Sequence, residues 1–260
     1  MFEPRDISNS VVSVRDAHAP SAKVFDCERD FETLPPALAE DLGLVVDSLE
    51  PASYPADWLP EDAPTLLARY ASSDLTIGMP GDGSIVWTRQ TDPPIVLVKP
   101  RVEGSPEPFL EFLLAEAFVE LGLDVPEQFI GFFEDEYCDL DRAVDLDPNG
   151  TYQIAAALYD GWVGLQTRAV FSDWHETHPE LADAWQDAGV RLEDRVSELP
   201  RAVARGDTDF ADATELACAA IKHAIELPAP FAALDTDAYR DHGPEYAITW
   251  AEKTFDALAE

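Results

Sequence analysis

The sequence lacks the short motifs that most often identify an enzyme. It contains no Gly-x-x-x-x-Gly-Lys-Ser/Thr loop, no Gly-x-Gly-x-x-Gly loop, no Gly-x-Ser-x-Gly and no His-Glu-x-x-His. These absences exclude the usual signatures of P-loop nucleotide binding, dinucleotide binding, serine hydrolases and zinc proteases. We therefore assign no catalytic residue and no cofactor from the sequence.

Cysteine is scarce as well. Cys27, Cys138 and Cys218 are odd in number and far apart, and no Cys-x-x-Cys pair occurs. This pattern supports neither a disulfide framework nor a zinc site and is typical of free thiols in a reducing cytoplasm. The first residues show no signal-peptide pattern, and the apolar run 154–159 is too short to span a membrane. We expect a soluble cytoplasmic protein without a membrane partner.

Lysine is nearly absent, with 4 Lys against 13 Arg, whereas acidic residues are in large excess. The 52 Asp and Glu against 17 Lys and Arg give a formal net charge of −35. This balance excludes a nucleic-acid partner, because phosphates must be met by clustered basic side chains. A disordered acidic tail is excluded too, since 46% of the residues are hydrophobic and disorder needs low hydrophobicity.

The negative charge is spread along the whole chain and is not gathered in a tail or patch. An acidic DNA mimic or a dedicated polycation binder would concentrate it on one face. An even acidic surface with few lysines is typical of proteins adapted to molar intracellular salt, where the Debye length falls to about 3 Å. The sequence therefore predicts a halophilic protein.

Extended segments are confined to one region of the chain. The apolar segments 75–77, 85–88 and 95–98 are separated by turn sequences rich in Pro, Gly and Asp. This spacing predicts a small three-stranded antiparallel meander with one face covered by helices. We expect an α+β, predominantly helical fold: an N-terminal α/β segment over 1–124 and a helical bundle over 125–260, which could also form one single domain.

Apolar residues at helical spacing predict the remaining elements. Thr33 and Ser105 are placed to cap two of the helices, and Pro200 is placed to end another. The segment 151–172 carries only two charges, so we expect it to form the central buried helix, with Ala157, Gly161 and Gly164 facing a close neighbour. The predicted helices cover 4–17, 33–49, 62–70, 105–122, 151–172, 181–200, 210–224 and 246–258.

Three basic residues form the first candidate ligand site. Arg89 and Lys99 would lie close together on adjacent strands of the predicted meander, and Arg101 follows just after the third strand. A helix is predicted to begin at 104–106, and helix N-termini attract anions. We interpret Arg89, Lys99 and Arg101 as a possible site for a phosphate or carboxylate; the alternative is that they form salt bridges with surrounding carboxylates.

The segment 145–150 matches the first half of an EF-hand calcium loop. The twelfth position of such a loop must supply a bidentate Glu, but Ala156 stands there. The sequence Asp-Pro-Asn-Gly is also a strong turn by itself. We interpret 145–150 as a turn that does not bind calcium.

Histidines offer two candidate metal sites. His175 and His178 have the spacing of two ligands on one helix face, but Pro179 and a predicted capping box favour a polar loop between helices. His223 and His242 would approach nearby aspartates if the last two helices pair. We expect these histidines to be boundary or loop residues and assign no metal.

Two segments carry a resemblance to known proteins: 91–101, with the sequence TDPPIVLVKPR, and 227–236, with the sequence LPAPFAALDT. Together with the acidic, lysine-poor composition, they resemble one of the uncharacterised haloarchaeal protein families. The resemblance implies an archaeal host and a cytoplasmic location. It transfers no site residue.

Three functions remain open from the sequence. The first is a non-enzymatic protein that contacts a protein partner or associates with itself, because catalytic constellations are absent and long amphipathic helices are present. The alternative is a protein that binds a small anion, or an enzyme acting on one, centred on Lys99 and Arg101. The third is a metal-dependent hydrolase that uses histidines of the helical half.

Stability should depend strongly on salt, because crowded surface carboxylates repel one another when screening is weak. We expect the protein to unfold on dilution below about 0.5 M KCl. Circular dichroism and thermal melting at several KCl concentrations measure this directly. An unchanged melting temperature in dilute buffer would contradict the halophilic interpretation.

Overall fold

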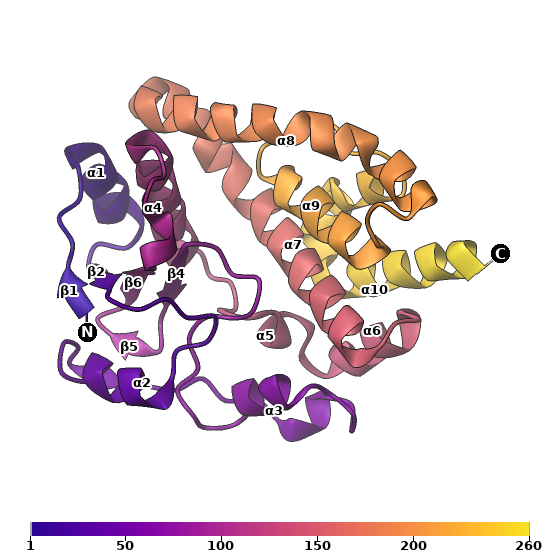
Figure 1. Cartoon of the computed structure of the whole chain (residues 1–260), viewed down its shortest axis with the longest axis horizontal. Coiled ribbons are helices and arrows are strands. Elements are labelled where there is room, and N and C mark those ends of the chain that lie inside the picture. The colour runs from indigo at the N-terminus through magenta and orange to yellow at the C-terminus, as the bar shows by residue number, and fades with distance from the viewer. Residues whose placement is uncertain (1, 260) are drawn as a thin grey trace. The chain divides into compact units, whose positions relative to one another are not determined.

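The computed structural model describes residues 2–259 and has an α+β fold in which helices predominate (Figure 1). The chain forms two compact units. The sheet unit contains the residues up to Ser53, Arg69–Glu127 and Trp174–Ala184. The helical unit contains Tyr54–Ala68, Gln128–Asp173 and the chain from Trp185 onward.

The sheet unit is built on a mixed four-stranded sheet with the order β1-β2-β6-β4. Strand β2 runs parallel to β6, whereas β1 and β4 are antiparallel to their neighbours. A separate two-stranded ladder pairs β3 with β5. The strands are β1 (Phe2–Pro4), β2 (Lys23–Cys27), β3 (Ser48–Leu49), β4 (Ile85–Thr88), β5 (Thr91–Asp92) and β6 (Ile95–Val98).

The predicted antiparallel meander was therefore wrong in detail. Two of its strands exist as β4 and β6, but 75–77 forms no strand. The main chain of Ile77 accepts a hydrogen bond from Leu34 outside any ladder. The partner that the meander lacked is β2, which the sequence analysis did not assign to any element.

Strand β6 has all four residues buried, as expected for a strand covered on both faces. Phe25, Ile95 and Leu97 face a hydrophobic cluster that also contains residues of α2 (Pro36–Leu42). Helix α4 (Glu107–Gly122) packs against β4, β6 and α1 (Asn9–His18). Strand β6, which ends at Val98, therefore lies between the hydrophobic cluster on one face and α4 on the other.

Several helix boundaries in the sheet unit differ from the prediction. The helix predicted over 33–49 is shortened to α2, which begins after Pro35, so Thr33 is not its cap. Helix α4 begins after Pro106 without a side-chain cap, so Ser105 is not its cap either. Helix α4 does end at Gly122, as predicted. The short helix η2 (Pro100–Val102) also belongs to the sheet unit, whereas η1 (Ala56–Trp58) lies in the helical unit and α3 (Thr65–Ala71) is divided between the two.

The helical unit is organised around α7 (Pro148–Thr177), which contains the segment predicted to be the central buried helix. A Cβ built on Gly161 would lie 3.0 Å from Ile221, and one built on Gly164 would lie 3.1 Å from the backbone nitrogen of Lys222. The predicted close neighbour is thus the end of α9. The remaining elements are α5 (Phe129–Phe133), η3 (Glu134–Glu136), α6 (Tyr137–Ala143), α8 (Pro179–Arg205), α9 (Phe210–Ile221), η4 (Phe231–Leu234) and α10 (Asp237–Ala259).

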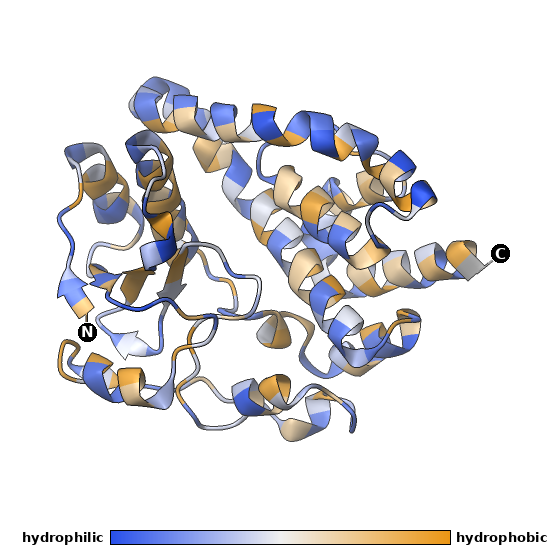
Figure 2. Ribbon diagram, in the orientation of Figure 1, coloured by the Kyte–Doolittle hydropathy of each residue, from blue (hydrophilic) through white to orange (hydrophobic). Residues whose placement is uncertain are grey.

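Two long helices contain proline. Helix α8 continues through Pro200 to Arg205, so the predicted end at Pro200 was wrong. Helix α10 is broken at Gly243, where φ is +49°, and Pro244 follows this kink. The turns of α8 alternate between hydrophilic and hydrophobic residues (Figure 2), which is the pattern of a helix with one face on the core.

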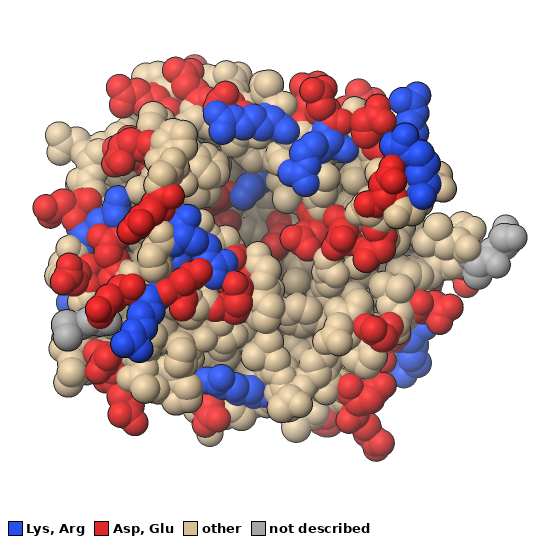
Figure 3. Space-filling view, in the orientation of Figure 1, with Lys and Arg blue, Asp and Glu red and all other residues tan. Residues whose placement is uncertain are grey.

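Carboxylates are distributed over the visible surface and are not confined to one patch (Figure 3). Most of the basic side chains in this view have acidic neighbours. Among the described residues, no helix is long and apolar enough to cross a membrane.

Gly164 offers a test of the packing between α7 and α9. A larger side chain there would meet the backbone of Lys222, which cannot rotate away as a side chain could. We expect Gly164→Leu to lower the free energy of unfolding by about 2 kcal/mol or more. Denaturant unfolding measures the change, with Gly83→Leu as the control because a Cβ at Gly83 meets no atom within 4 Å. Equal stability of the two variants would contradict the close approach.

Candidate functional site

The carboxyl ends of the parallel strands β2 and β6 lie at one edge of the sheet. The beginning of the antiparallel strand β4 lies at the same edge, since Ile85 pairs with Val98. Three loop segments therefore converge there: 28–32, 78–84 and 99–102. Ligands in α/β sheets commonly bind at this edge of a parallel pair.

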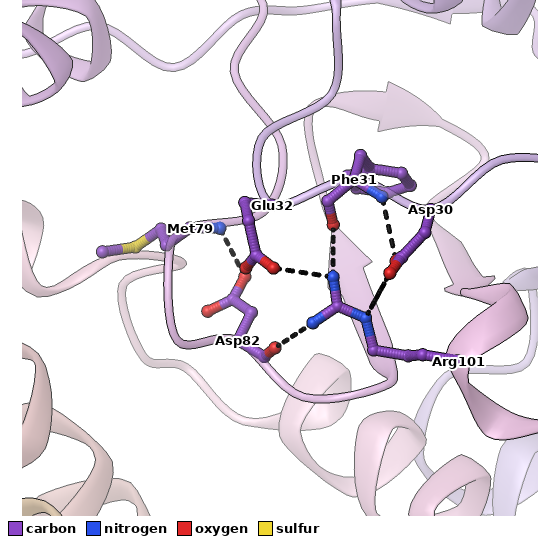
Figure 4. A network of polar contacts seen from close by, with 6 residues as sticks. All are labelled: Asp30, Phe31, Glu32, Met79, Asp82 and Arg101. Carbon is purple, nitrogen blue, oxygen red and sulfur yellow. Dashed lines mark hydrogen bonds and ion pairs between the residues drawn. The ribbon is translucent and has the colours of Figure 1, made fainter.

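Arg101 ties the three segments together (Figure 4). Its Nε donates to both carboxylate oxygens of Asp30, at 2.8 and 3.0 Å. Its Nη2 donates to Glu32 Oε1 at 2.8 Å and to the carbonyl of Phe31 at 3.2 Å, and its Nη1 donates to the carbonyl of Asp82 at 3.4 Å. The bond from Arg101 holds the pKa of Asp30 below its usual range. The guanidinium is thus engaged with the protein's own acceptors.

Lys99 lies between β6 and η2 and has no exposed surface. Its Nζ has no hydrogen-bond partner and lies 4.9 Å from the centre of the Phe31 ring, within the range of a cation–π contact. Burial lowers the pKa of Lys99, and the negative charge of Asp82 opposes that shift. Lys99 is the most unusual group at this edge because a buried ammonium normally has acceptors.

Among the acidic groups, Asp82 has the largest electrostatic effect on the pKa of Lys99. Its Oδ2 accepts the backbone N–H of Met79 at 2.6 Å (Figure 4). Burial raises the pKa of Asp82 to about 6, although the Met79 bond and the charges of Lys99 and Arg101 act to lower it. The loop that carries Asp82 is anchored by Tyr70, whose hydroxyl donates to the carbonyl of Gly78.

Arg89 is not part of this edge. Because β4 is antiparallel to β6, Thr88 pairs with Ile95, and Arg89 follows at the opposite end from Lys99. The expectation that Arg89 and Lys99 lie close together was therefore wrong. The Arg89 guanidinium donates to backbone carbonyls at the end of α4 and just beyond it, namely those of Glu120, Leu121, Leu123 and Val125. It satisfies a helix C-terminus, where a cation is favoured.

The charge at the sheet edge argues for a structural role. Two cations, Lys99 and Arg101, face three carboxylates, those of Asp30, Glu32 and Asp82. An added anion would meet a cluster that is already balanced or negative. The salt-bridge interpretation therefore accounts for Arg101, and only the unpartnered Nζ of Lys99 still favours a ligand.

The calcium-like loop proves to be a helix start. Asp147 Oδ1 accepts the backbone N–H groups of Asn149 and Gly150, at 3.0 and 2.9 Å, and α7 begins at Pro148. The segment is thus a helix cap with proline in the first turn, not the isolated turn that we predicted. The Asp147 side chain is thus held by backbone N–H groups in the first turn of α7.

The histidines have protein partners or lie at helix ends. His223 Nδ1 lies 3.0 Å from the carbonyl of Trp185, and its ring stacks on the Trp185 ring. Burial lowers the pKa of His223 to about 4. His178 lies between α7 and α8, and His242 precedes the kink of α10. Within residues 2–259, no group of three or more His, Cys, Asp or Glu side chains is arranged to hold a metal ion.

A pocket in the helical unit was missed by the sequence analysis. It has a volume of about 720 Å³, well within the range of small-molecule sites. It is lined by the last turns of α8, the start of α9, the segment 229–233 and one face of α10, and it is open on one side. Its lining residues are mainly apolar or aromatic: Pro200, Val203, Ala204, Phe210, Ala229, Pro230, Phe231, Ala233, Tyr246, Thr249, Trp250, Lys253, Thr254, Ala257 and Leu258.

The aromatic floor of this pocket is rigidly held. The Phe210 ring stacks on Phe231 and Trp250, with centroids 5.4 and 6.2 Å away. Trp250 Nε1 donates to the carbonyl of Pro230 at 3.1 Å, and Tyr246 Oη donates to that of Ala233 at 3.0 Å. These bonds fix the segment 229–233 against α10. The sequence did contain the stripe Tyr246, Trp250 and Leu258, but helical spacing alone does not separate a pocket wall from a core.

The raised pKa of Asp82 predicts how the free energy of unfolding changes with pH. Its pKa rises from 3.8 to about 6 on folding, so the folded state binds this proton more tightly than the unfolded state. Stability from this group is therefore lost as the pH rises from about 4 to about 6. We expect Asp82→Asn to exceed the parent by about 2 kcal/mol at pH 7.5 and to match it near pH 4. Urea unfolding in molar KCl measures the difference.

The exposed residue Asp47 supplies the control for that measurement. Asp47→Asn should show no comparable gain at pH 7.5. If Asp82→Asn is less stable than the parent at pH 7.5, the proton linkage has the opposite sign and the inference that burial raises the pKa of Asp82 is wrong.

Comparison with known proteins gives a family and no activity. No curated protein and no solved structure matches the chain. One family model matches residues 1–258, nearly the whole sequence, and it describes a family of unknown function. This confirms the expected membership of an uncharacterised family. The chain belongs to the family of unknown function DUF7089.

Proposed function

We propose that the protein acts by binding and that its ligand site is the apolar pocket bounded by α8, α9, the segment 229–233 and α10. The observation that carries this proposal is the pocket itself, with about 720 Å³ of space against a floor of aromatic rings. An apolar concave site with few polar groups is the usual form of a small-molecule site. The proposed occupant is a small molecule with an apolar body.

The chemistry of the lining supports binding over catalysis. The pocket contains no His, Cys, Asp or Glu among its described lining residues, and these side chains supply most acid–base and nucleophilic groups. The N–H of Trp250 and the hydroxyl of Tyr246 are donated to the protein's own carbonyls. Affinity would therefore come mainly from removing apolar surface from water.

Filling the pocket tests the proposal. Ala257 lines the pocket and is exposed, so a larger side chain there can enter the pocket without disturbing the core. We expect the uncharged fluorescent probe N-phenyl-1-naphthylamine to bind the parent saturably in molar KCl. Ala257→Trp should weaken this binding by about tenfold or more, because its indole occupies the space for the probe.

Ala238→Trp is the matched control, since Ala238 is exposed on the same helix and does not line the pocket. It should bind the probe as the parent does. No saturable binding by the parent, or equal binding by both tryptophan variants, would overturn the proposal. If the parent self-associates and Ala257→Trp alone prevents this, the pocket instead holds an apolar segment of a second copy.

A small anion at Lys99 and Arg101 is the second candidate function, and one observation favours it: the buried Nζ of Lys99 has no hydrogen-bond partner. Titration with phosphate and with citrate in a thermal-shift assay tests it. A saturable shift that is lost in Lys99→Met and kept in Ala257→Trp would assign the function to the sheet edge and not to the pocket.

A further inference from the structure

The described lining of the pocket carries one positive charge and no negative charge, and this indicates the class of ligand that it would bind. Lys253 is the only charged residue among the described lining residues. The chain has 4 Lys and a formal net charge of −35, and its 52 acidic residues outnumber its 17 basic residues about threefold. One positive charge at an apolar pocket is a feature that simple core packing does not require.

Burial separates the floor of the pocket from its rim. Phe231, Trp250 and Thr254 are buried, and their side chains form the inner wall. Lys253 and Leu258 also line the pocket but are exposed, which places them at its rim. The positive charge therefore lies where a ligand would leave the pocket and meet water.

The apolar character of the inner wall also determines which end of a ligand binds inside the pocket. A polar head group placed beside Phe231 and Trp250 would lose its water, and the donors of Trp250 and Tyr246 already serve Pro230 and Ala233. A buried polar group without partners is costly. An apolar body is thus favoured inside, and a charged head is favoured at Lys253.

We propose that the pocket takes an amphipathic anion, whose apolar body fills the space above Phe210, Phe231 and Trp250 and whose single negative head group pairs with Lys253. This proposal rests on the proposed function, because it uses the same pocket. A carboxylate and a phosphate monoester share the required chemistry, since either can accept charge-assisted hydrogen bonds from an ammonium.

The ion pair between the head group and Lys253 contributes only modestly to the binding affinity. Lys253 is exposed, and the acidic residues Glu252 and Asp256 flank it on α10. Exposed ion pairs typically contribute little, and molar salt screens them further. The apolar body sets most of the affinity, and Lys253 sets the preference for an anion.

Three ligands with the same ten-carbon chain test the preference: decanoate, decanol and decyltrimethylammonium. We expect decanoate to displace N-phenyl-1-naphthylamine more strongly than decyltrimethylammonium does. The overall charge of −35 predicts the reverse order for nonspecific adsorption, so the order separates the two explanations. Decyl phosphate, compared with decanoate, distinguishes the two sources of the head group.

Variants at Lys253 complete the test. Lys253→Gln should weaken decanoate binding about three- to fivefold and leave decanol unchanged, whereas Lys253→Arg should retain the preference for the anion. Lys23→Gln makes the same change of net charge at a residue that does not line the pocket and should have no effect. Melting temperatures of all variants verify folding.

The outcomes separate this inference from the function on which it rests. If neither decanol nor decanoate displaces the probe, the proposed function itself fails. If both bind equally and Lys253→Gln changes neither, the pocket still binds apolar molecules and the anionic class is wrong.

Discussion

The burial of strand β6 on both faces is the constraint on which the sheet unit depends. Its four residues are enclosed between the cluster that contains Phe25 and the helix α4. A strand in this position needs a partner on each side, and it finds β2 in parallel and β4 in antiparallel. That choice of partners brings Asp30, Asp82 and Arg101 to one edge. The polar network of Figure 4 is therefore a consequence of the strand order. It connects the loops that follow β2 and precede β4 to the segment that follows β6.

Sequence periodicity predicted the helices better than the sheet, for a physical reason. Apolar residues at helical spacing report a local structure, so the interiors of α4, α7 and α8 could be predicted, and the small residues of α7 indicated its close neighbour. Strand pairing is non-local. Nothing within 23–27 indicates a parallel partner about seventy residues away. The error at Arg89 has a different cause. The antiparallel direction of β4 and β6 was predicted correctly, and that direction by itself places Arg89, which follows β4, at the opposite end from Lys99, which follows β6.

Proline and capping rules failed where tertiary packing was stronger. Pro200 is accepted inside α8, although proline removes a helical hydrogen bond and usually ends a helix. The cost of that lost bond is offset by the apolar face of α8, where Val196 and Leu199 are buried. Continuation of α8 past Pro200 also places Val203 and Ala204 at the apolar pocket. A helix that ended at Pro200 would leave this side of the pocket open.

Salt and burial act differently on the two candidate sites. Screening over about 3 Å weakens attraction between exposed charges, but it does not remove the penalty for taking a charge out of water. Lys99 and Asp82 are perturbed first by burial, so their behaviour should persist at high salt. A ligand site in the same medium can rely little on long-range attraction and must recognise shape. The pocket meets this condition: small side chains at Ala204, Ala229 and Ala257 leave space in front of large rings that are held in place. Apolar surface that faces this open space is not removed from water by the fold itself, and this supports our proposal that a ligand with an apolar body occupies the pocket.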